Sequence, residues 1–296
     1  MMASNDDATR PIDEMSVKEL KALLNKAGES AVGITEKSEL RTKAREAKAK
    51  LDKIAATNKT SSSKWTMRYE YENGATDENA ELIIVLMHGL GSNGDNLAPL
   101  AEAIGTRLLG KKAIFIFPTA PEGYWFPLNP MDWMVTAMQN GQDSLARLIR
   151  TEFNGIPQCR INGEEMIQYL LEKAPHARLF LGGFSQGAMT STDIALHHAF
   201  HNQESRFDGI IHLSGAPIDI EVWASRLQKI SKKPRIYISH GRQDMVLPFF
   251  VSDWSNQIFT KAGCQVAYHP HPEGHTVGPI DPIAQFILAA LNDTNK

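Results

Sequence analysis

Cysteine is scarce in this sequence: the chain of 296 residues has two, Cys159 and Cys264. Two cysteines cannot build the framework of several disulfides that stabilises small secreted domains. We interpret both as reduced thiols in a reducing compartment. Excess charge of one sign is also missing, because the net charge is −3. The field of the whole molecule therefore gives no reason to expect a polyanionic partner.

Long hydrophobic runs are missing as well. No uninterrupted apolar stretch approaches the roughly 20 residues that a transmembrane helix needs. The amino-terminal residues are polar and acidic, without the apolar core of a secretory signal. The start Met1-Met2-Ala3 lacks the glycine that myristoylation requires. We therefore expect a cytoplasmic protein without a membrane span.

The composition, 42% hydrophobic and 22% charged, suits one large α/β domain with a small appendage. Residues 1–14 are expected to be disordered, and residues 15–56 to form a pair of helices. Residues 57–64 contain three consecutive serines and are predicted to be a flexible linker. The large domain is then expected to occupy residues 65–296.

The pair of helices has a clear start signal. Ser16 can cap the first helix, Glu19 completes a capping box, and Met15 precedes the cap as a hydrophobic staple would. The second helix is expected to begin near residue 35 or 38 and to end near residue 55. Two helices joined by a glycine-containing loop resemble a SAP-like module, which implies a possible nucleic-acid or protein contact through residues 15–56. Because acidic residues interleave with the basic ones, we favour a solvated helix face over a nucleic-acid site.

After residue 65, short apolar runs alternate with helical stretches, which indicates a mostly parallel sheet covered by helices on both faces. The strands are expected at 67–71, 82–87, 113–117, 179–182, 209–213, 235–239 and 265–269. The helices are expected at 97–108, 163–172, 186–200, 251–262 and 279–291.

One stretch carries the main chemical signal. The apolar run 178–184 ends in Gly183-Phe-Ser185-Gln-Gly187, and a helix-compatible segment follows at once. This is the strand, sharp turn and helix of a nucleophile elbow, which exposes a serine oxygen at the top of a sheet. Side chains in place of the two glycines would collide with the neighbouring strand and helix. We predict that Ser185 is a nucleophile; the alternative is an ordinary strand-to-helix turn.

A serine hydroxyl needs a base that an acid orients, and in this fold the acid precedes the histidine along the chain. Asp244 follows the apolar run 235–239, and His275 lies on a loop tip directly before the last predicted helix. We predict that these two complete a triad with Ser185. Asp253 and Asp281 are the alternatives for the acid.

The oxyanion of an acyl-transfer intermediate must be met by preorganised N–H groups. One is expected from Gln186, directly after the nucleophile, and the other from Leu90, in the glycine-rich loop 88–94. The same loop fits the G-x-G-x-x-G pattern of dinucleotide sites. That interpretation requires an acidic residue at the end of the next strand, and residues 115–119 contain none.

Six motifs in this order resemble the acyl-protein thioesterase/phospholipase–carboxylesterase family of α/β-hydrolases. They are His88-Gly-Leu-Gly, Pro118-Thr-Ala-Pro, Gly-Phe-Ser185-Gln-Gly-Ala-Met, Leu213-Ser-Gly-Ala, His240-Gly-Arg-Gln-Asp244 and Gly-His275. The resemblance covers about residues 80–291. It implies an α/β-hydrolase fold, a triad of Ser185, Asp244 and His275, and oxyanion donors at Leu90 and Gln186.

The segment between residues 118 and 162 is rich in aromatic residues and methionine. Such a stripe is usually core, but Trp125, Trp133 and Met134 are candidates to line an acyl groove. No His/Cys cluster has the spacing of a metal site, and the chemistry needs no cofactor.

We therefore expect a serine hydrolase that cleaves acyl thioesters or carboxylic esters, with an S-acylated protein or a small acyl ester as substrate. Depalmitoylation is the leading form of this expectation. The alternatives are a general carboxylesterase or lysophospholipase and, from another class, a non-catalytic binding module tethered by the amino-terminal helices.

Overall fold

The chain divides into two compact units, Met1–Ser63 and Lys64–Lys296. The structure is a computed structural model, and it describes residues 12–26, 34, 36–60, 65–128, 142–150, 153–202 and 207–292. The two units are described separately, because each has a hydrophobic core of its own.

The first unit contains a short 3₁₀ turn η1 (Ile12–Glu14) and two helices, α1 (Val17–Lys26) and α2 (Lys37–Thr60). The capping box predicted before α1 forms: the Ser16 N–H donates to Glu19 Oε2 (2.6 Å), and the Glu19 N–H donates to Ser16 Oγ (3.3 Å). The helices bury a small apolar core that includes Leu20, Leu24, Leu40, Ala44 and Ala47.

Two predicted boundaries in this unit need correction. Residues 12–14 form a turn within the stretch expected to be disordered, and α2 continues to Thr60, so the first four residues of the expected linker 57–64 are helical. The composition of residues 57–60 did not reveal that they are helical. No glycine or proline interrupts the helix before Ser61, so no local stop signal ends it earlier. The rest of both expected segments, residues 1–11 and 61–64, lies outside the described residues.

The second unit is built on one seven-stranded sheet with the order β1-β3-β2-β4-β5-β6-β7. Only β1 is antiparallel, to β3, whereas the other described pairs are parallel. The strands are β1 (Thr66–Glu72), β2 (Leu82–Met87), β3 (Ala113–Thr119), β4 (Arg178–Phe184), β5 (Phe207–Leu213), β6 (Arg235–Gly241) and β7 (Val266–His271).

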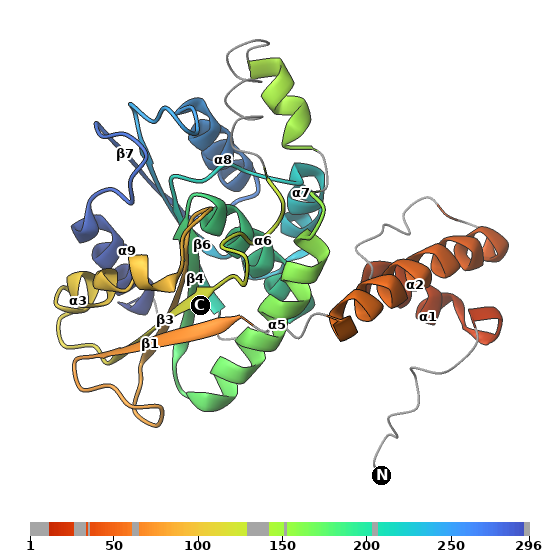
Figure 1. The fold of residues 1–296 in the computed structure, drawn as a ribbon, viewed down its shortest axis with the longest axis horizontal. Helices are drawn as coiled ribbons and strands as arrows, with labels where there is room; N and C mark the ends of the chain where they lie inside the picture. Colours follow the sequence, from red (N-terminus) through yellow and green to blue (C-terminus); the bar gives the residue numbers. More distant parts are fainter. Residues whose placement is uncertain are drawn as a thin grey trace. The chain divides into compact units, whose positions relative to one another are not determined.

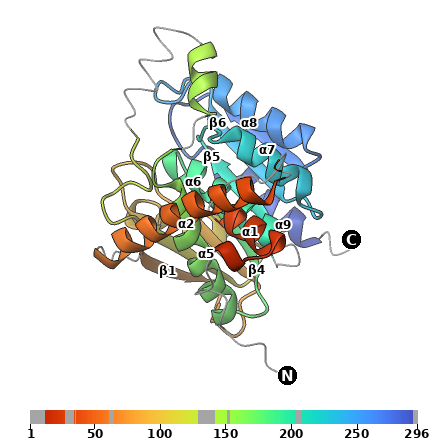
Figure 2. The ribbon, with the colours of Figure 1, turned by 90° about the vertical axis from the view of Figure 1, so that its right-hand side faces the viewer.

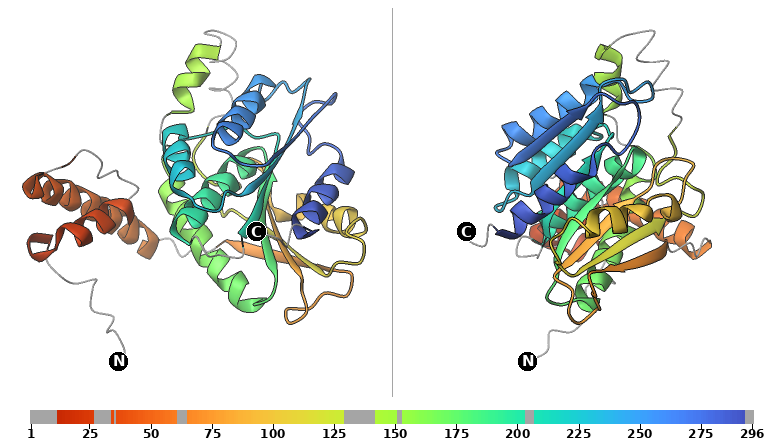
Figure 3. Two further views of the ribbon diagram at one scale, coloured as in Figure 1. Left: turned by 180° about the vertical axis from the view of Figure 1, so that it is seen from behind. Right: turned by 90° about the vertical axis from the view of Figure 1, so that its left-hand side faces the viewer.

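Helices cover both faces of this sheet. One layer holds α5 (Ile156–Lys173), α6 (Gln186–His201), α7 (Ile220–Lys229) and α8 (Phe250–Lys261), and the other holds α3 (Pro99–Gly105) and α9 (Ile280–Asn292) (Figure 1). Figure 2 views the unit from the side of α5, α6 and α7, and the right-hand panel of Figure 3 views it from the side of α3 and α9. The predicted mostly parallel sheet with helices on both faces is confirmed.

The interior strands lie close to their predicted positions, because they are buried on both faces and are therefore continuous apolar runs in the sequence. Every residue of β2 and of β5 is buried, for example. Sequence reasoning did not predict α7 or the helical residues 142–148. It also began α5 at residue 163, seven residues after its observed start at Ile156.

A buried ion network fixes α6, the helix that begins directly after Ser185, against its neighbours. Asp193 on α6 accepts bonds from Arg160 Nε (2.6 Å) on α5 and from Trp223 Nε1 (2.9 Å) on α7. Arg226 on α7 lies 3.3 Å from Asp193, and Arg160 also bonds Asp219 (2.9 Å). Burial would raise the pKa of Asp193, but the two arginines outweigh it and lower that pKa to about 2. The carboxylate is therefore charged at neutral pH, and the network holds the elbow helix in place.

Across the described ranges, no helix is both long and apolar enough to cross a membrane.

Candidate active site

Ser185 occupies the strained turn expected of a nucleophile elbow. It lies between β4 and α6 with φ 56° and ψ −120°, a backbone conformation that residues other than glycine rarely adopt. Its N–H donates to the carbonyl of Leu213 at the end of β5 (2.9 Å). A Cβ at Gly187 would lie 2.0 Å from Met87 O, and one at Gly183 would lie 2.5 Å from the same oxygen. The predicted steric need for both glycines is therefore confirmed.

His275 and Asp244 meet Ser185 at the carboxyl edge of the sheet. Ser185 Oγ lies 2.9 Å from His275 Nε2, and His275 Nδ1 lies 2.6 Å from Asp244 Oδ2. The Asp244 side chain is fully buried, whereas 17% of the His275 side chain is exposed. Since a carboxylate only accepts, Nδ1 carries the proton and Nε2 is left to accept from the serine hydroxyl. The structure thus brings the three predicted residues into one line of hydrogen bonds.

Asp244 is held in its ionised form. Burial would raise the pKa of Asp244, but hydrogen bonds from His240, His275 and the Leu247 N–H outweigh it, so the pKa lies well below its ordinary value. Its other oxygen, Oδ1, accepts the main-chain N–H groups of Val246 and Leu247, each over 2.8 Å. The carboxylate is therefore charged and fixed in orientation across the range in which an imidazole titrates.

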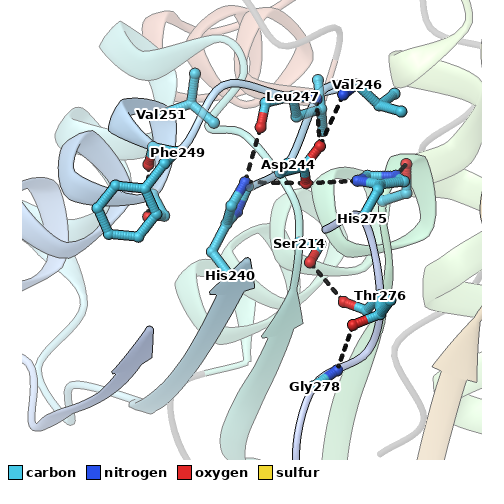
Figure 4. Close-up of polar contacts among 12 residues, drawn as sticks. Ser214, His240, Asp244, Val246, Leu247, Phe249, Val251, His275, Thr276 and Gly278 are labelled. Atoms are coloured by element: carbon cyan, nitrogen blue, oxygen red, sulfur yellow. Dashed lines mark hydrogen bonds and ion pairs between the residues drawn. The ribbon is translucent and has the colours of Figure 1, made fainter. Parts of the chain in front are cut away.

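The loop that carries His275 is positioned by contacts on both sides (Figure 4). Ser214, directly after β5, donates its hydroxyl to Thr276 O over 2.6 Å. On the other side, Gly241 at the end of β6 packs so closely that a Cβ there would lie 2.0 Å from Gly274 O. The Phe184 ring lies 4.8 Å from the imidazole of His275. The imidazole is thus placed by strand ends that are far apart in the sequence.

The two expected oxyanion donors border the same cavity as Ser185. Gln186 is the first residue of α6, and the first N–H groups of a helix have no acceptor within it. In the loop after β2, the Gly91 N–H donates to Gly123 O (2.8 Å) and the Ser92 N–H to Gly89 O (3.3 Å). Leu90 directly precedes Gly91, and its N–H makes no such main-chain bond to another described residue. Both residues therefore border the cavity that holds Ser185, as the oxyanion-donor prediction requires.

The structure does not place Trp125 where the predicted substrate contact would require it. Only 6% of the residue is exposed, and it is not among the described residues that line the cavity. Its Nε1 donates to His88 O (2.7 Å), and its main-chain N–H donates to Gln186 Oε1 (3.0 Å). Trp125 therefore packs behind the oxyanion loop rather than in the groove. The other two predicted contacts, Trp133 and Met134, lie outside the described residues.

The cavity at Ser185 has a volume of about 450 Å³ and a mainly apolar wall. Its apolar lining consists of Leu90, Leu97, Leu128, Phe184, Met189, Val246, Leu247 and Val277. Ser185, Gln186 and His275 line it as well, together with the polar residues Ser92, Asn96 and Thr276, so the reacting groups face a mainly apolar chamber. Such a chamber suits a substrate with a hydrocarbon portion next to a reactive carbonyl.

The alternative acids take other contacts. Asp253 on α8 accepts from the Tyr268 hydroxyl (2.8 Å), and Asp281 on α9 pairs with Arg107 at the surface. Within the described ranges, no group of three or more His, Cys, Asp or Glu side chains is placed to hold a metal ion.

Sequence reasoning missed the role of two histidines that it quoted only as parts of motifs. His88 accepts the Ala120 N–H at Nε2 (3.1 Å) and so donates from Nδ1 to Gly89 O (2.7 Å), which ties β3 to the oxyanion loop. His240 contacts Asp244. The signal available was position: each histidine stands with a glycine where a buried strand ends.

Comparison with known proteins agrees with this geometry. The model of the Phospholipase/Carboxylesterase family matches residues 73–280. An acyl-protein thioesterase 1 from Eremothecium gossypii is 24% identical over 72% of this chain and 89% of its own length. An acyl-protein thioesterase 1 from Schizosaccharomyces pombe is 27% identical over 58% of this chain and 72% of its own length.

Solved structures show the same fold. The esterase PE8 superposes with a TM-score of 0.58 at 23% identity, covering 77% of this chain and 98% of that one. Acyl-protein thioesterase 2 of Zea mays superposes with a TM-score of 0.56 at 19% identity, covering 76% and 99%. The fold is that of the α/β-hydrolases, and the relatives are esterases and thioesterases. The chain belongs to the phospholipase/carboxylesterase family and is a hydrolase of the esterase/thioesterase kind.

Proposed function

We propose that this protein is a serine hydrolase that cleaves acyl thioesters or carboxylic esters through an acyl-enzyme, most closely in the manner of an acyl-protein thioesterase. The observation that carries the proposal is the unbroken line of hydrogen bonds from Ser185 through His275 to Asp244, with Ser185 and His275 lining a mainly apolar cavity. This arrangement is the one that turns a serine hydroxyl into a nucleophile.

The proposed reaction has two halves. Ser185 Oγ attacks the acyl carbonyl carbon while His275 Nε2 takes the hydroxyl proton, and Asp244 orients and stabilises the resulting imidazolium. The N–H groups of Leu90 and Gln186 bind the oxyanion. His275 gives its proton to the leaving thiol or alcohol as the bond to it breaks. A water molecule then releases the acid by the same steps, and the mechanism uses no cofactor.

The substrate proposal rests on the cavity and on the relatives. The apolar wall fits the hydrocarbon part of an acyl group. The named relatives from Eremothecium gossypii and Schizosaccharomyces pombe are acyl-protein thioesterases. We therefore propose an S-acylated protein as the leading substrate, with depalmitoylation in the cytoplasm as the specific form. Small carboxylic esters and lysophospholipids are the alternatives.

Labelling with a fluorophosphonate probe tests the chemistry. We expect wild-type protein to be labelled and Ser185→Ala to lose both labelling and hydrolysis of a p-nitrophenyl ester. Ser255→Ala is the matched control, because this buried hydroxyl on α8 bonds the Val251 carbonyl (3.3 Å) and should keep full labelling. Folded wild-type protein that takes no label would favour the non-catalytic binding module instead.

A second experiment addresses the substrate. Acyl-thioester and acyl-oxyester substrates of increasing chain length would compete against the probe. A preference for long-chain thioesters supports the thioesterase form of the proposal. Equal use of short oxyesters would instead favour a general carboxylesterase.

A further inference from the structure

His240 lies beside the proposed catalytic acid, on the side away from His275. It is the second-last residue of β6, and none of its surface is exposed. Its Nε2 lies 2.9 Å from the Leu247 carbonyl oxygen and 3.2 Å from Asp244 Oδ2. Figure 4 shows the rings of His240 and His275 on opposite sides of the Asp244 carboxylate.

The partners of His240 fix where its proton lies. A carbonyl oxygen only accepts, so the bond to Leu247 O places the hydrogen on Nε2. Nδ1 is buried and has no hydrogen-bond partner among the described residues. A proton on Nδ1 would leave a buried charged donor unpaired, which is costly. The Nε2–H of His240 therefore lies between Leu247 O and Asp244 Oδ2.

The two carboxylate oxygens of Asp244 have different hydrogen-bond partners. Oδ1 is occupied by the main-chain N–H groups of Val246 and Leu247. Oδ2 receives His275 Nδ1 at 2.6 Å and His240 Nε2 at 3.2 Å. A donor on the same oxygen draws negative charge away from the bond to His275. It also fixes the direction in which Oδ2 points.

We infer that His240 is a positioning residue for the triad: it holds Asp244 Oδ2 toward His275 and limits the charge that this oxygen presents to the imidazole. The inference rests on the proposed function of the triad. Without the His240 donor, Oδ2 would hold the proton on His275 more strongly. His275 would then act as a base only at higher pH.

Other titratable groups surround this pair. Burial lowers the pKa of His212 on β5 to about 4, and burial also lowers the pKa of His271 on β7. Both are therefore neutral at neutral pH. Two charged side chains also lie nearby: Arg242, over the Phe249 ring at 4.9 Å, and the largely exposed Glu273, near His271. Exposed charges are screened by solvent and salt, so the buried donor to Oδ2 is the group expected to shift the acid limb of the pH profile.

Three variants of His240 separate a tuning role from a packing role. His240→Phe keeps a buried ring without a donor. His240→Gln places an amide N–H near the position of Nε2, whereas His240→Asn places one nearer Nδ1. The pH profile of kcat/KM would be measured with a p-nitrophenyl ester, together with the pH dependence of the fluorophosphonate labelling rate.

We expect His240→Phe to lower kcat by about tenfold, the effect of one hydrogen bond to a charged group. KM should change by less than about twofold, because His240 does not line the cavity described above. The acid limb should move to higher pH by about half a unit or more. Gln should restore the wild-type profile and Asn should not. If the Phe variant does not fold, the comparison of Gln with Asn still decides.

His198→Phe is the matched control. His198 is also a buried histidine bound to a carboxylate, Glu164 (2.9 Å), but it lies near the far end of α6 from Ser185. We expect this variant to lose stability and keep the wild-type acid limb. An acid limb of the Phe variant that coincides with wild type, or a Gln variant no better than Asn, overturns the inference. The proposed function fails in a different way, through activity that survives in Ser185→Ala.

Discussion

Trp125 and His88 are joined by two contacts behind the oxyanion loop. The Trp125 indole Nε1 donates to the His88 carbonyl over 2.7 Å, and the two rings lie 4.7 Å apart. The Trp125 N–H donates to Gln186 Oε1, and Gln186 Nε2 donates to Phe126 O over 2.7 Å. One buried tryptophan therefore connects the loop of Leu90 with the first residue of α6, the two expected sources of oxyanion donors.

Replacing Trp125 with Phe should slow catalysis more than it weakens binding. The variant keeps a buried ring but loses the bond to His88, so the Leu90 N–H is less well placed for the oxyanion. Loss of a whole oxyanion donor costs on the order of 10²–10³ in kcat, and we expect about a tenth of that loss here. Steady-state kinetics would show kcat reduced and KM nearly constant. Trp254→Phe on α8, whose ring packs on Phe250, is the control, and equal kcat in the two variants would contradict the prediction.

Gly241→Ala should displace the His275 loop. The new Cβ would lie 2.0 Å from Gly274 O and 2.3 Å from Glu273 O, so the main chain of that loop must move. A displacement of about 1 Å at a catalytic group can cost on the order of 10² in rate. We expect a loss of that size in the fluorophosphonate labelling rate, with Ser185 still present. Gly274→Ala in the same loop should cost far less, because its Cβ would meet nothing closer than Gln243 O at 3.5 Å. Similar losses in both variants would argue against the steric explanation.

Asp193→Asn should lower the unfolding free energy and make it less dependent on pH in the acid range. The pKa of Asp193 is about 2 in the folded chain and about 3.9 in an unfolded one, so the folded state binds this proton less tightly. The stabilisation is therefore complete above about pH 4 and is lost as the pH falls toward 2. At pH 7 we expect the variant to lose about 3 kcal/mol of unfolding free energy, because the charge of Asp193 no longer offsets the two buried arginines, although Arg160 still bonds Asp219.

Denaturant unfolding at several pH values would measure this effect. The difference between variant and wild type should shrink as the pH falls from 4 to 2. The control is Glu221→Gln, which removes an exposed pair with Arg150 and should cost less than about 1 kcal/mol. A difference for Asp193→Asn that stays constant down to pH 2 would exclude the ionised carboxylate as its cause.

Removing residues 1–63 should leave the hydrolase activity in place. The two units have separate hydrophobic cores, and the triad and cavity described here lie within residues 64–296. We expect the shortened chain to hydrolyse a p-nitrophenyl ester with kcat/KM within about twofold of the full chain. A loss of tenfold or more would mean that the first unit contributes to the larger one. The measurement pairs ester kinetics with thermal unfolding of both chains.

Much of the large unit follows from local sequence signals. Buried parallel strands are continuous apolar runs, so β2 was predicted at its observed bounds, Leu82–Met87. The elbow around Ser185 was predictable because its two close backbone approaches admit only glycine. The chain order of serine, aspartate and histidine pointed to Asp244 and His275, since each follows an apolar run that ends at the same edge of the sheet.

Other features were not available from the sequence. The amphipathic pattern of α7 was not recognised, and the helical ending of α2 falls in residues that composition alone marked as a linker. The prediction that Trp125 lines the groove is wrong, because aromatic composition does not show which way a ring faces. Its actual partners, His88 and Gln186, lie 37 and 61 positions away in the chain.

The sequence by itself determined the kinds of groups at this site and the strand ends that carry them, because hydrophobic period and glycine placement act locally. Only the tertiary structure decided that Asp244 has a histidine on either side of one oxygen and that a buried tryptophan supports the oxyanion loop. The first contact joins the segments that follow β6 and β7, and the second joins the loops after β2 and β3 to the start of α6. Hydrogen-bond geometry between such distant segments is fixed by packing, which no local pattern records.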